Sequence, residues 1–97
     1  MKTRFHRLAR REFKDAVDYY NAEETGLGDR FAAVIRSAVE DLVKSPDRWP
    51  ILEGRIRRRI LKKFRYVLLY AESGDSILIV AVMHTSRKPR YWKDRID

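Results

Sequence analysis

Four residues in the second half of the chain have side chains that could act in acid–base chemistry on a phosphodiester: Arg59, His84, Arg87 and Tyr91. Cleavage of RNA needs a base for the 2′-hydroxyl, an acid for the leaving oxygen and a group that stabilises the anionic transition state. Histidine exchanges protons near neutral pH, so His84 suits proton transfer, and the arginines suit the developing charge. If the protein is a nuclease, we expect these four residues to be its catalytic groups.

The same residues also have simpler interpretations. His84 follows an apolar run and is typical of a packed or capping histidine. The pair Tyr91-Trp92 is typical of an aromatic clamp that closes the edge of a core. The run of arginines at residues 57–59 is typical of an edge strand whose charge opposes aggregation. The residue types alone therefore leave a catalytic and a structural interpretation open.

Nothing in the sequence indicates a metal site, a cofactor or a disulfide. The chain has no cysteine, and its two histidines, His6 and His84, are too far apart for the usual spacing of metal ligands. We expect His6 to lie at the surface without a role. The apolar run at residues 77–83 is too short to cross a bilayer, and no apolar segment follows the charged residues at the amino terminus. We therefore predict a cytoplasmic protein with no cofactor and no membrane partner.

The net charge is +8, and all of the excess lies in the second half of the chain. Residues 1–54 contain ten basic and ten acidic residues, whereas residues 55–97 contain twelve and four. Such an asymmetry indicates a surface that binds an anionic partner. The alternative is a basic surface that only contacts water. We predict that the strands after residue 55 present an uncovered cationic surface to a macromolecular partner.

Apolar residues at helical spacing predict two helices in the first half of the chain. The first spans about residues 9–24, and one face of it carries Phe13, Ala16, Val17 and Tyr20. Gly26 suits the end of this helix, and a second helix runs to about Lys44, because Pro46 follows closely. The short connection predicts an antiparallel helical hairpin. Residues 3–8, before the hairpin, suit a brief edge strand.

From residue 55 the apolar pattern changes from helical spacing to alternation. Residues 55–64, 66–72 and 76–84 are predicted strands, residues 46–54 a loop, and residues 90–96 one or two helical turns. In the first of these strands, alternation separates an apolar face from a basic face: Ile56, Ile60 and Phe64 against Arg55, Arg57, Arg59 and Lys63.

These elements predict one α+β domain spanning residues 1–97. A helical hairpin that covers one face of a small twisted antiparallel sheet satisfies the two-layer rule for a domain. The expected order is strand, helix, helix and a three-stranded meander, followed by a short C-terminal helix. The first strand is expected to join the sheet at an edge.

Several motifs, in order along the chain, resemble the RelE/ParE superfamily of bacterial toxins. Residues 57–70, RRRILKKFRYVLLY, resemble the sheet signature of these toxins. A second match is residues 77–84, ILIVAVMH, which are followed by Arg87, Pro89, Tyr91, Trp92 and Arg95. Earlier parts of the chain also resemble the superfamily: Tyr19-Tyr20, Gly26-Leu27-Gly28 and Trp49-Pro50.

The resemblance implies the toxin of a type II toxin–antitoxin system and a fold of two N-terminal helices on a twisted antiparallel sheet. It also implies a cognate antitoxin, a small acidic protein whose partly disordered segment wraps and neutralises the toxin. The charge asymmetry fits this partner, because a disordered acidic chain can order on a basic surface and cover a large area.

The superfamily divides by target. RelE-like members cleave mRNA in the ribosome, whereas ParE-like members inhibit DNA gyrase without catalysis. Val67 stands where many members carry an arginine, and valine can neither hold a phosphate nor donate a proton. Arg65 follows Phe64 where a proline is familiar, and it could compensate for the missing arginine. Arg87 and Tyr91 lie about where the nuclease members carry an arginine and a tyrosine.

We therefore favour a ParE-like toxin that inhibits DNA gyrase by binding it. The alternative is a ribosome-dependent mRNA endoribonuclease, which would need no metal, and a further alternative is a non-catalytic nucleic-acid-binding domain. The latter is suggested by charge alone, since no recognition helix or RNA-stacking motif is evident. The residues expected to contact a partner are Arg55, Arg57, Arg59, Lys63, Arg65, Arg87, Tyr91, Trp92 and Arg95.

Overall fold

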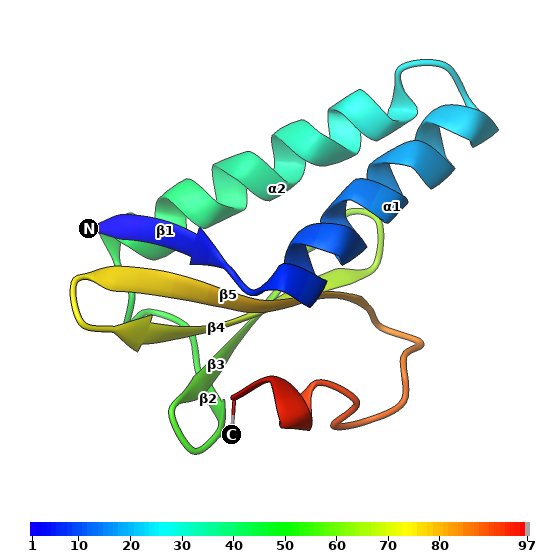
Figure 1. The fold of residues 1–97 in the computed structure, drawn as a ribbon. Coiled ribbons are helices and arrows are strands. Elements are labelled where there is room, and N and C mark those ends of the chain that lie inside the picture. The colour runs from blue at the N-terminus through cyan, green and yellow to red at the C-terminus, as the bar shows by residue number, and fades with distance from the viewer. Residues whose placement is uncertain (97) are drawn as a thin grey trace.

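The computed structural model describes residues 1–96, which form a helical hairpin on one face of a five-stranded sheet (Figure 1). The elements in chain order are β1 (Lys2–Phe5), α1 (Arg7–Glu23), α2 (Leu27–Lys44), β2 (Ile51–Glu53), β3 (Ile56–Ile60), β4 (Tyr66–Ser73), β5 (Ser76–His84) and the 3-10 helix η1 (Lys93–Ile96). The C-terminal segment with η1 lies under the face opposite to the hairpin (Figure 1). The predicted α+β class and the predicted order of elements are confirmed.

The strand order in the sheet is β1-β5-β4-β3-β2. β2, β3, β4 and β5 pair antiparallel, and β1 pairs parallel with β5 at the edge. The antiparallel meander and the edge position of β1 agree with the prediction, whereas the direction of β1 makes the sheet mixed. A parallel neighbour needs a long connection, and the hairpin together with the intervening strands supplies it.

The prediction of a loop over residues 46–54 is wrong for its last part. Residues 51–53 form β2, which pairs with the start of β3 through the partners Ile51 and Arg57. Gly54 has a positive φ of 57°, which allows the tight connection between β2 and β3. A strand of three residues is too short to show alternation, so the sequence pattern did not reveal it.

The main core lies between the hairpin and the sheet. Most of the helical side of this core comes from α2, whose buried residues include Phe31, Ile35, Ala38 and Leu42. The facing side chains of the sheet are buried as well and include Leu68, Tyr70, Ile77, Ile79 and Val82. The apolar positions that predicted the helices therefore face the sheet, as expected of an amphipathic helix.

His6 caps the first helix, so the prediction that it has no role is wrong. Its Nδ1 accepts a hydrogen bond of 3.0 Å from the amide of Leu8, one of the donors that the start of α1 leaves unpaired. Burial, together with the positive charges of Arg95 and Arg7, lowers the pKa of His6. The imidazole therefore stays neutral and keeps its acceptor to a lower pH than an isolated histidine would.

Gly28 is a point of close contact between the two helices. A Cβ at this position would lie 2.1 Å from the carbonyl oxygen of Val17, which is far inside van der Waals contact. The Gly28 amide also donates a hydrogen bond of 2.7 Å to the side chain of Asn21. Glycine is therefore required here by contact with α1.

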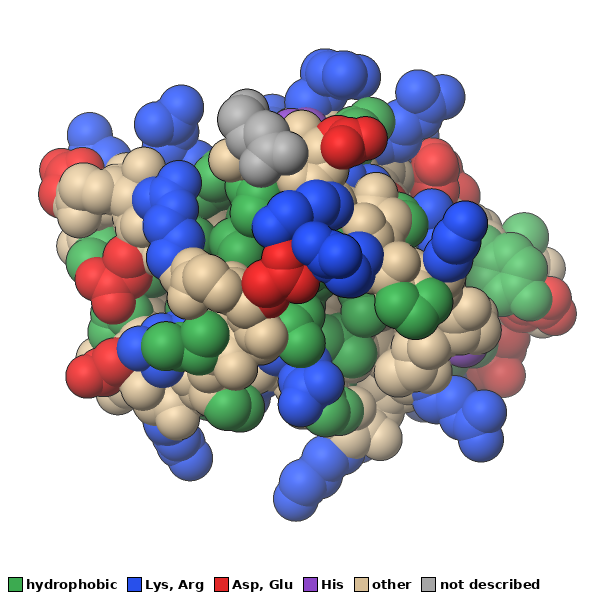
Figure 2. Space-filling model, turned by 90° about the horizontal axis from the view of Figure 1, so that it is seen from below, with side chains coloured by type: hydrophobic (Ala, Val, Ile, Leu, Met, Phe, Trp, Pro, Cys, Tyr) green, Lys and Arg blue, Asp and Glu red, His purple; other side chains and the backbone are tan. Residues whose placement is uncertain are grey.

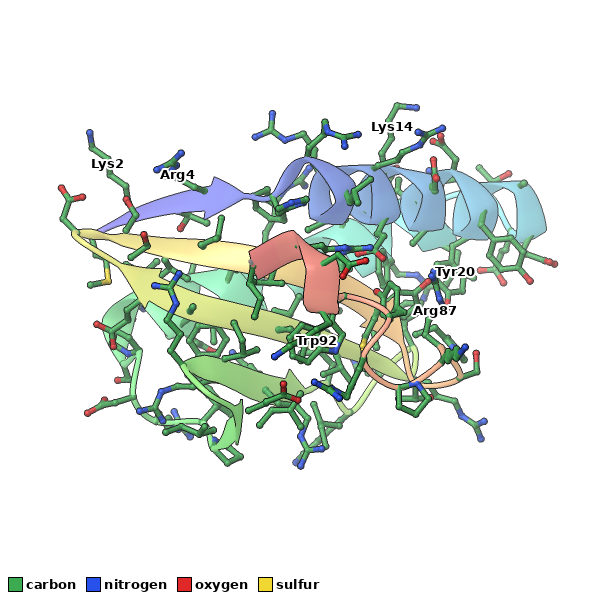
Figure 3. The ribbon with its side chains drawn as sticks, turned by 60° about the horizontal axis from the view of Figure 1, so that its bottom comes forward. Lys2, Arg4, Lys14, Tyr20, Arg87 and Trp92 are labelled. Atoms are coloured by element: carbon green, nitrogen blue, oxygen red, sulfur yellow. The ribbon has the colours of Figure 1, made fainter. Side chains whose placement is uncertain are left out.

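A smaller apolar cluster lies on the other face of the sheet, and Trp92 is its largest member. Trp92 is 2% exposed and packs with Ile56, Val67, Leu69, Ala71 and Val80. Figure 3 shows Trp92 against this face beside the C-terminal segment. Because Trp92 is buried, it acts as the aromatic clamp that was one of its two sequence interpretations.

The predicted apolar face of the first strand of the meander is wrong beyond Ile56. Ile56 is fully buried, but Ile60 is 60% exposed. Phe64 lies outside β3 in the left-handed region, with a φ of 67°, and its ring packs against Tyr20 and Phe31 on the helical side. The turn after Ile60 breaks the alternation, so strand parity does not extend to Phe64 or to Arg65, whose φ is also positive.

We expect Gly28→Ala to lower the free energy of unfolding by about 2 kcal/mol, because the new methyl group forces α1 and α2 apart. Helix propensity alone predicts the opposite sign, since alanine is favoured over glycine inside a helix by about 1 kcal/mol. Urea unfolding measured by circular dichroism checks this. Ser37→Ala at an exposed position of α2 is the control and should change stability by less than about 0.5 kcal/mol. An unchanged or more stable Gly28→Ala variant would contradict the close helix contact.

Candidate functional site

β1 is shorter than its neighbour β5, and this leaves part of the β5 edge without a strand. The pairing between them ends where Phe5 meets Ile79. Beyond that point the amide of Val82 donates to Oε1 of Glu12 at 3.1 Å, and the carbonyl of Val80 accepts from Arg95 at 3.1 Å. Side chains from α1 and η1 therefore satisfy the edge that β1 does not reach, as buried backbone groups require.

Glu12, Tyr91 and Arg95 form a connected set, which we call the Glu12 cluster. Arg95 holds both carboxylate oxygens of Glu12, at 2.8 and 2.9 Å, and the Tyr91 hydroxyl donates to Oε2 at 2.6 Å. The side chains of Arg95 and Glu12 are only 9% and 15% exposed. A bidentate pair of this kind is charge-assisted and fixes the orientation of both groups.

The Glu12 cluster fixes the protonation of its members. Burial by itself would raise the pKa of Glu12, but the hydrogen bonds from Arg95, Tyr91 and the Val82 amide together hold that pKa below its ordinary value. Burial and the neighbouring carboxylate raise the pKa of the Tyr91 hydroxyl well above its ordinary value. Glu12 is therefore a carboxylate and Tyr91 a neutral phenol at physiological pH.

A cleft of about 240 Å³ lies beside the Glu12 cluster, between α1 and the ends of β4 and β5. His84, Arg87 and Tyr66 line it, together with Asp15 and Tyr19 of α1. The rings of Tyr66 and His84 meet edge to face at 5.4 Å, and the guanidinium of Arg87 lies 3.9 Å from the centre of the Tyr91 ring. Figure 3 shows Arg87 on the loop that follows β5.

The structure brings three of the four candidate nuclease residues together and leaves the fourth elsewhere. His84, Arg87 and Tyr91 lie around this cleft, whereas Arg59 lies on β3, two strands from β5, or on the order of 10 Å across the sheet. One ring nitrogen of His84 is already used in local contacts. Its Nδ1 lies 2.7 Å from the Ser86 hydroxyl and accepts a hydrogen bond from the Ser86 amide. This places His84 as the cap of the turn after β5.

Arg57 and Arg59, two of the residues expected to contact a partner, are engaged within the chain. Arg57 donates to the carbonyls of Asp47 and Trp49, at 3.2 and 2.6 Å. Arg59 donates to the Ala38 carbonyl at 2.8 Å and pairs with Asp41 at 3.1 Å. The basic side of β3 therefore faces α2 and the loop before β2, where it holds these segments to the sheet.

The remaining expected contact residues are distributed over several surfaces. Arg55, Lys63, Arg65 and Arg87 are exposed and Trp92 is buried. In the Glu12 cluster, Tyr91 is half-buried and the side chain of Arg95 is largely buried. Lysine and arginine side chains lie at separate places on the rim and in the middle of the face seen in Figure 2, not in one patch. The prediction of a single uncovered cationic surface on the strands is therefore wrong, because part of the charge is used for internal contacts.

Glu12 is the residue that sequence reasoning missed. A signal was present, because Glu12 lies three residues after Ala9 and four before Ala16, both of which are buried in α1. A carboxylate on the buried stripe of an amphipathic helix needs a partner. Its partners Val82, Tyr91 and Arg95 lie 70, 79 and 83 residues later in the chain, so only the fold identifies them.

The sequence matches the family described as ParE toxin of type II toxin-antitoxin system, parDE, over residues 3–89. The chain belongs to this family. The fold is similar to the solved structure described as the chromosomal ParDE TA system from P. aeruginosa, with a TM-score of 0.76 and 16% identity over 87% of this chain and 95% of that one. No curated protein matches the sequence significantly.

Membership in the ParE family confirms the resemblance found in the sequence, including the ParE-like branch. The matched region ends before Tyr91, so two members of the Glu12 cluster lie in the part of the chain that follows it. No helix within residues 1–96 is long and apolar enough to span a membrane.

We expect Glu12→Gln to detach the C-terminal segment and to lower the free energy of unfolding by about 3 kcal/mol, since it leaves the Arg95 charge buried without its partner. Because the pKa of Glu12 is lower in the folded protein than in the unfolded chain, its contribution is complete above the ordinary carboxyl pKa. That contribution is lost as the pH falls through the lowered value. The free energy of unfolding should therefore decrease less in the variant than in the unmodified protein as the pH is lowered.

The measurement is Trp92 fluorescence during urea unfolding between pH 3 and pH 7, in a Trp49→Phe background that leaves one tryptophan. Glu53→Gln is the matched control, because Glu53 also pairs with the C-terminal segment, through Arg90 and Lys93. Those pairs are more exposed, so the loss should be smaller. Equal effects of the two substitutions would show that the Glu12 cluster has no special role.

Proposed function

We propose that this ParE-family protein inhibits DNA gyrase by binding it and performs no chemistry of its own. Membership in the family supports the toxin function, and the ParE-like branch favours gyrase as the target. The main support for the absence of catalysis is the hydrogen bonding and protonation of Tyr91. Its hydroxyl proton is held by the Glu12 carboxylate at 2.6 Å, and its pKa is raised, so it is a poor acid and a poor base near neutral pH.

Two further observations support a binding function. Arg59 lies apart from His84 and Arg87, so the chain does not assemble a base, an acid and a cation around one point. Val67, which stands where many superfamily members carry an arginine, is buried against Trp92 on the opposite face of the sheet. The group that would hold a scissile phosphate is therefore replaced by a core residue.

An mRNA endoribonuclease is the second candidate function, and the cleft beside the Glu12 cluster favours it. His84 and Arg87 both line this cleft, and an exposed arginine next to an imidazole is suited to a phosphate. Asp15 lines the same cleft and opposes an anion there, while the Glu12 carboxylate is neutralised by Arg95. The arrangement is therefore weaker for phosphodiester chemistry than its residue types suggest.

We also propose that the protein acts in the cytoplasm and is neutralised there by an antitoxin encoded beside it. The net charge of +8 favours an acidic partner. The exposed cations Lys63, Arg65 and Arg87 are available to such a partner, since none of them forms an ion pair within residues 1–96. Growth arrest on expression alone, and rescue on co-expression with the adjacent reading frame, would support this proposal.

We expect the purified protein to inhibit supercoiling of relaxed plasmid by DNA gyrase and to leave mRNA intact in a reconstituted translation reaction. Tyr91→Phe keeps the ring that Arg87 contacts and removes only the hydroxyl. The inhibitory concentration should therefore change by less than about tenfold. A nuclease that used this hydroxyl for proton transfer would lose about 100-fold or more in rate.

Arg87→Ala and its exposed neighbour Lys88→Ala form a second pair for the same assays. If Arg87 contacts gyrase, its substitution weakens inhibition in proportion to one lost contact, on the order of tenfold, and Lys88→Ala has a smaller effect. Ribosome-dependent mRNA cuts that disappear with Arg87→Ala, without any effect on gyrase, would replace the gyrase proposal by the nuclease one.

A further inference from the structure

The two neighbours of β4 each have an edge that the outer strands cover only in part. On β5, the edge beyond β1 is closed by Glu12 and Arg95. On β3, Ile56 and Arg57 pair with Glu53 and Ile51 of β2. The next residue, Arg58, donates its amide to the Pro50 carbonyl at 3.0 Å, which is the last backbone hydrogen bond on this side of β3. The chain turns away before Pro50, so β3 continues past the end of its partner.

The hydrogen-bond register shows which backbone groups this leaves open. The Leu61 amide donates to the Tyr66 carbonyl at 2.9 Å, and Arg59 lies opposite Leu68 in the same register. Alternate residues of an antiparallel strand point their amide and carbonyl to opposite sides. The amide and carbonyl of Ile60 therefore point away from β4, to the side where no strand within residues 1–96 pairs with them.

A groove of about 560 Å³ lies along this open edge, between α2 and the end of β3. We call it the basic groove. Its apolar floor includes Val34, Ala38 and Leu61, and its rim carries Arg48, Lys62 and Lys63. The side chain of Ile60, which is 60% exposed, forms part of the same surface.

The charges around the basic groove are only partly balanced within the chain. Arg59 pairs with Asp41 and lies 4.5 Å from the centre of the Trp49 ring, so it belongs to the wall of the groove. Lys62 and Lys63 are exposed, and neither forms an ion pair within the described part of the chain. The rim is therefore complementary to carboxylates.

We propose that β3 accepts an additional strand at Ile60, supplied by an extended acidic segment of the antitoxin that lies in the basic groove. This rests on the proposed neutralisation by an antitoxin. The backbone of the segment pairs with the amide and carbonyl of Ile60, its apolar side chains contact Val34 and Leu61, and its carboxylates meet Lys62 and Lys63. Strand addition of this kind takes its affinity from the backbone and its specificity from alternate side chains.

The β1 edge is the competing place for an added strand. The Lys2 amide donates to the carbonyl of Asp75, just before β5, and the His6 amide donates to Ile79 of β5. The Thr3 amide between them therefore points outward, and an apolar groove of about 530 Å³ lies beside it. Its lining carries Arg36 together with Glu40, so the two charges offset each other. An acidic segment is therefore favoured at β3 over β1, and the two edges form a matched pair for experiment.

The first test compares two charge reversals of equal size, in complexes with the protein encoded by the adjacent reading frame. Lys62→Glu with Lys63→Glu should weaken its binding at least tenfold in calorimetry at 150 mM salt. Lys2→Glu with Arg4→Glu on β1 should weaken it less than threefold, since those cations lie outside the groove. Equal losses, or a larger loss from the β1 pair, would overturn the proposal.

The second test measures hydrogen exchange of single amides by NMR in the free protein and in this complex. The Ile60 amide should exchange at least tenfold more slowly in the complex, whereas the Leu61 amide, already bonded to Tyr66, should change little. Protection of the Thr3 amide without protection of Ile60 would move the added strand to β1 and refute the assignment to β3.

The outcomes separate this proposal from the proposed function. If the adjacent-frame protein binds tightly but neither test responds at β3, neutralisation stands and the basic groove is the wrong site. If that protein does not bind the unmodified chain, both the neutralisation and the groove assignment fail. Gyrase inhibition is measured on the toxin alone and is decided independently of both.

Discussion

The buried ion pair between Glu12 and Arg95 is the interaction on which the arrangement of this protein depends. It closes the β5 edge that β1 leaves open, joins the first helix to the C-terminal segment and holds Tyr91 in place. Removing two charges from water is costly, and the cost is met only when the geometry is good and the remaining hydrogen bonds are made. Both carboxylate oxygens are satisfied here, by a guanidinium, a phenol and a backbone amide.

The same pair decides what the neighbouring cleft can do. Histidine, arginine and tyrosine meet there, and their types alone indicate acid–base chemistry on a phosphate. The Tyr91 hydroxyl donates a hydrogen bond to the Glu12 carboxylate, and Arg95 forms an ion pair with the same carboxylate. What remains exposed is a surface with Arg87 at its edge, which is consistent with the proposed binding function.

The basic residues of the second half serve two purposes that composition does not separate. Arg57, Arg59 and Arg95 donate to backbone carbonyls and carboxylates and so hold loops and helices to the sheet. Lys62, Lys63, Arg65 and Arg87 remain exposed. In a chain of 97 residues with a small core, guanidinium groups that bridge segments add to the cohesion that apolar burial supplies.

The amino-acid sequence was enough to predict both long helices, the three long strands, their order and the family resemblance, because helical and alternating spacing are local properties and the motifs are contiguous. It could not place β2, since three residues show no pattern, or the turn of Phe64 and Arg65 into the left-handed region, which ended the parity of β3. It also could not tell which cations are exposed. That depends on contacts such as those between Arg59 and Asp41 or between Glu12 and Arg95, whose members lie 18 and 83 residues apart and meet only in the folded chain.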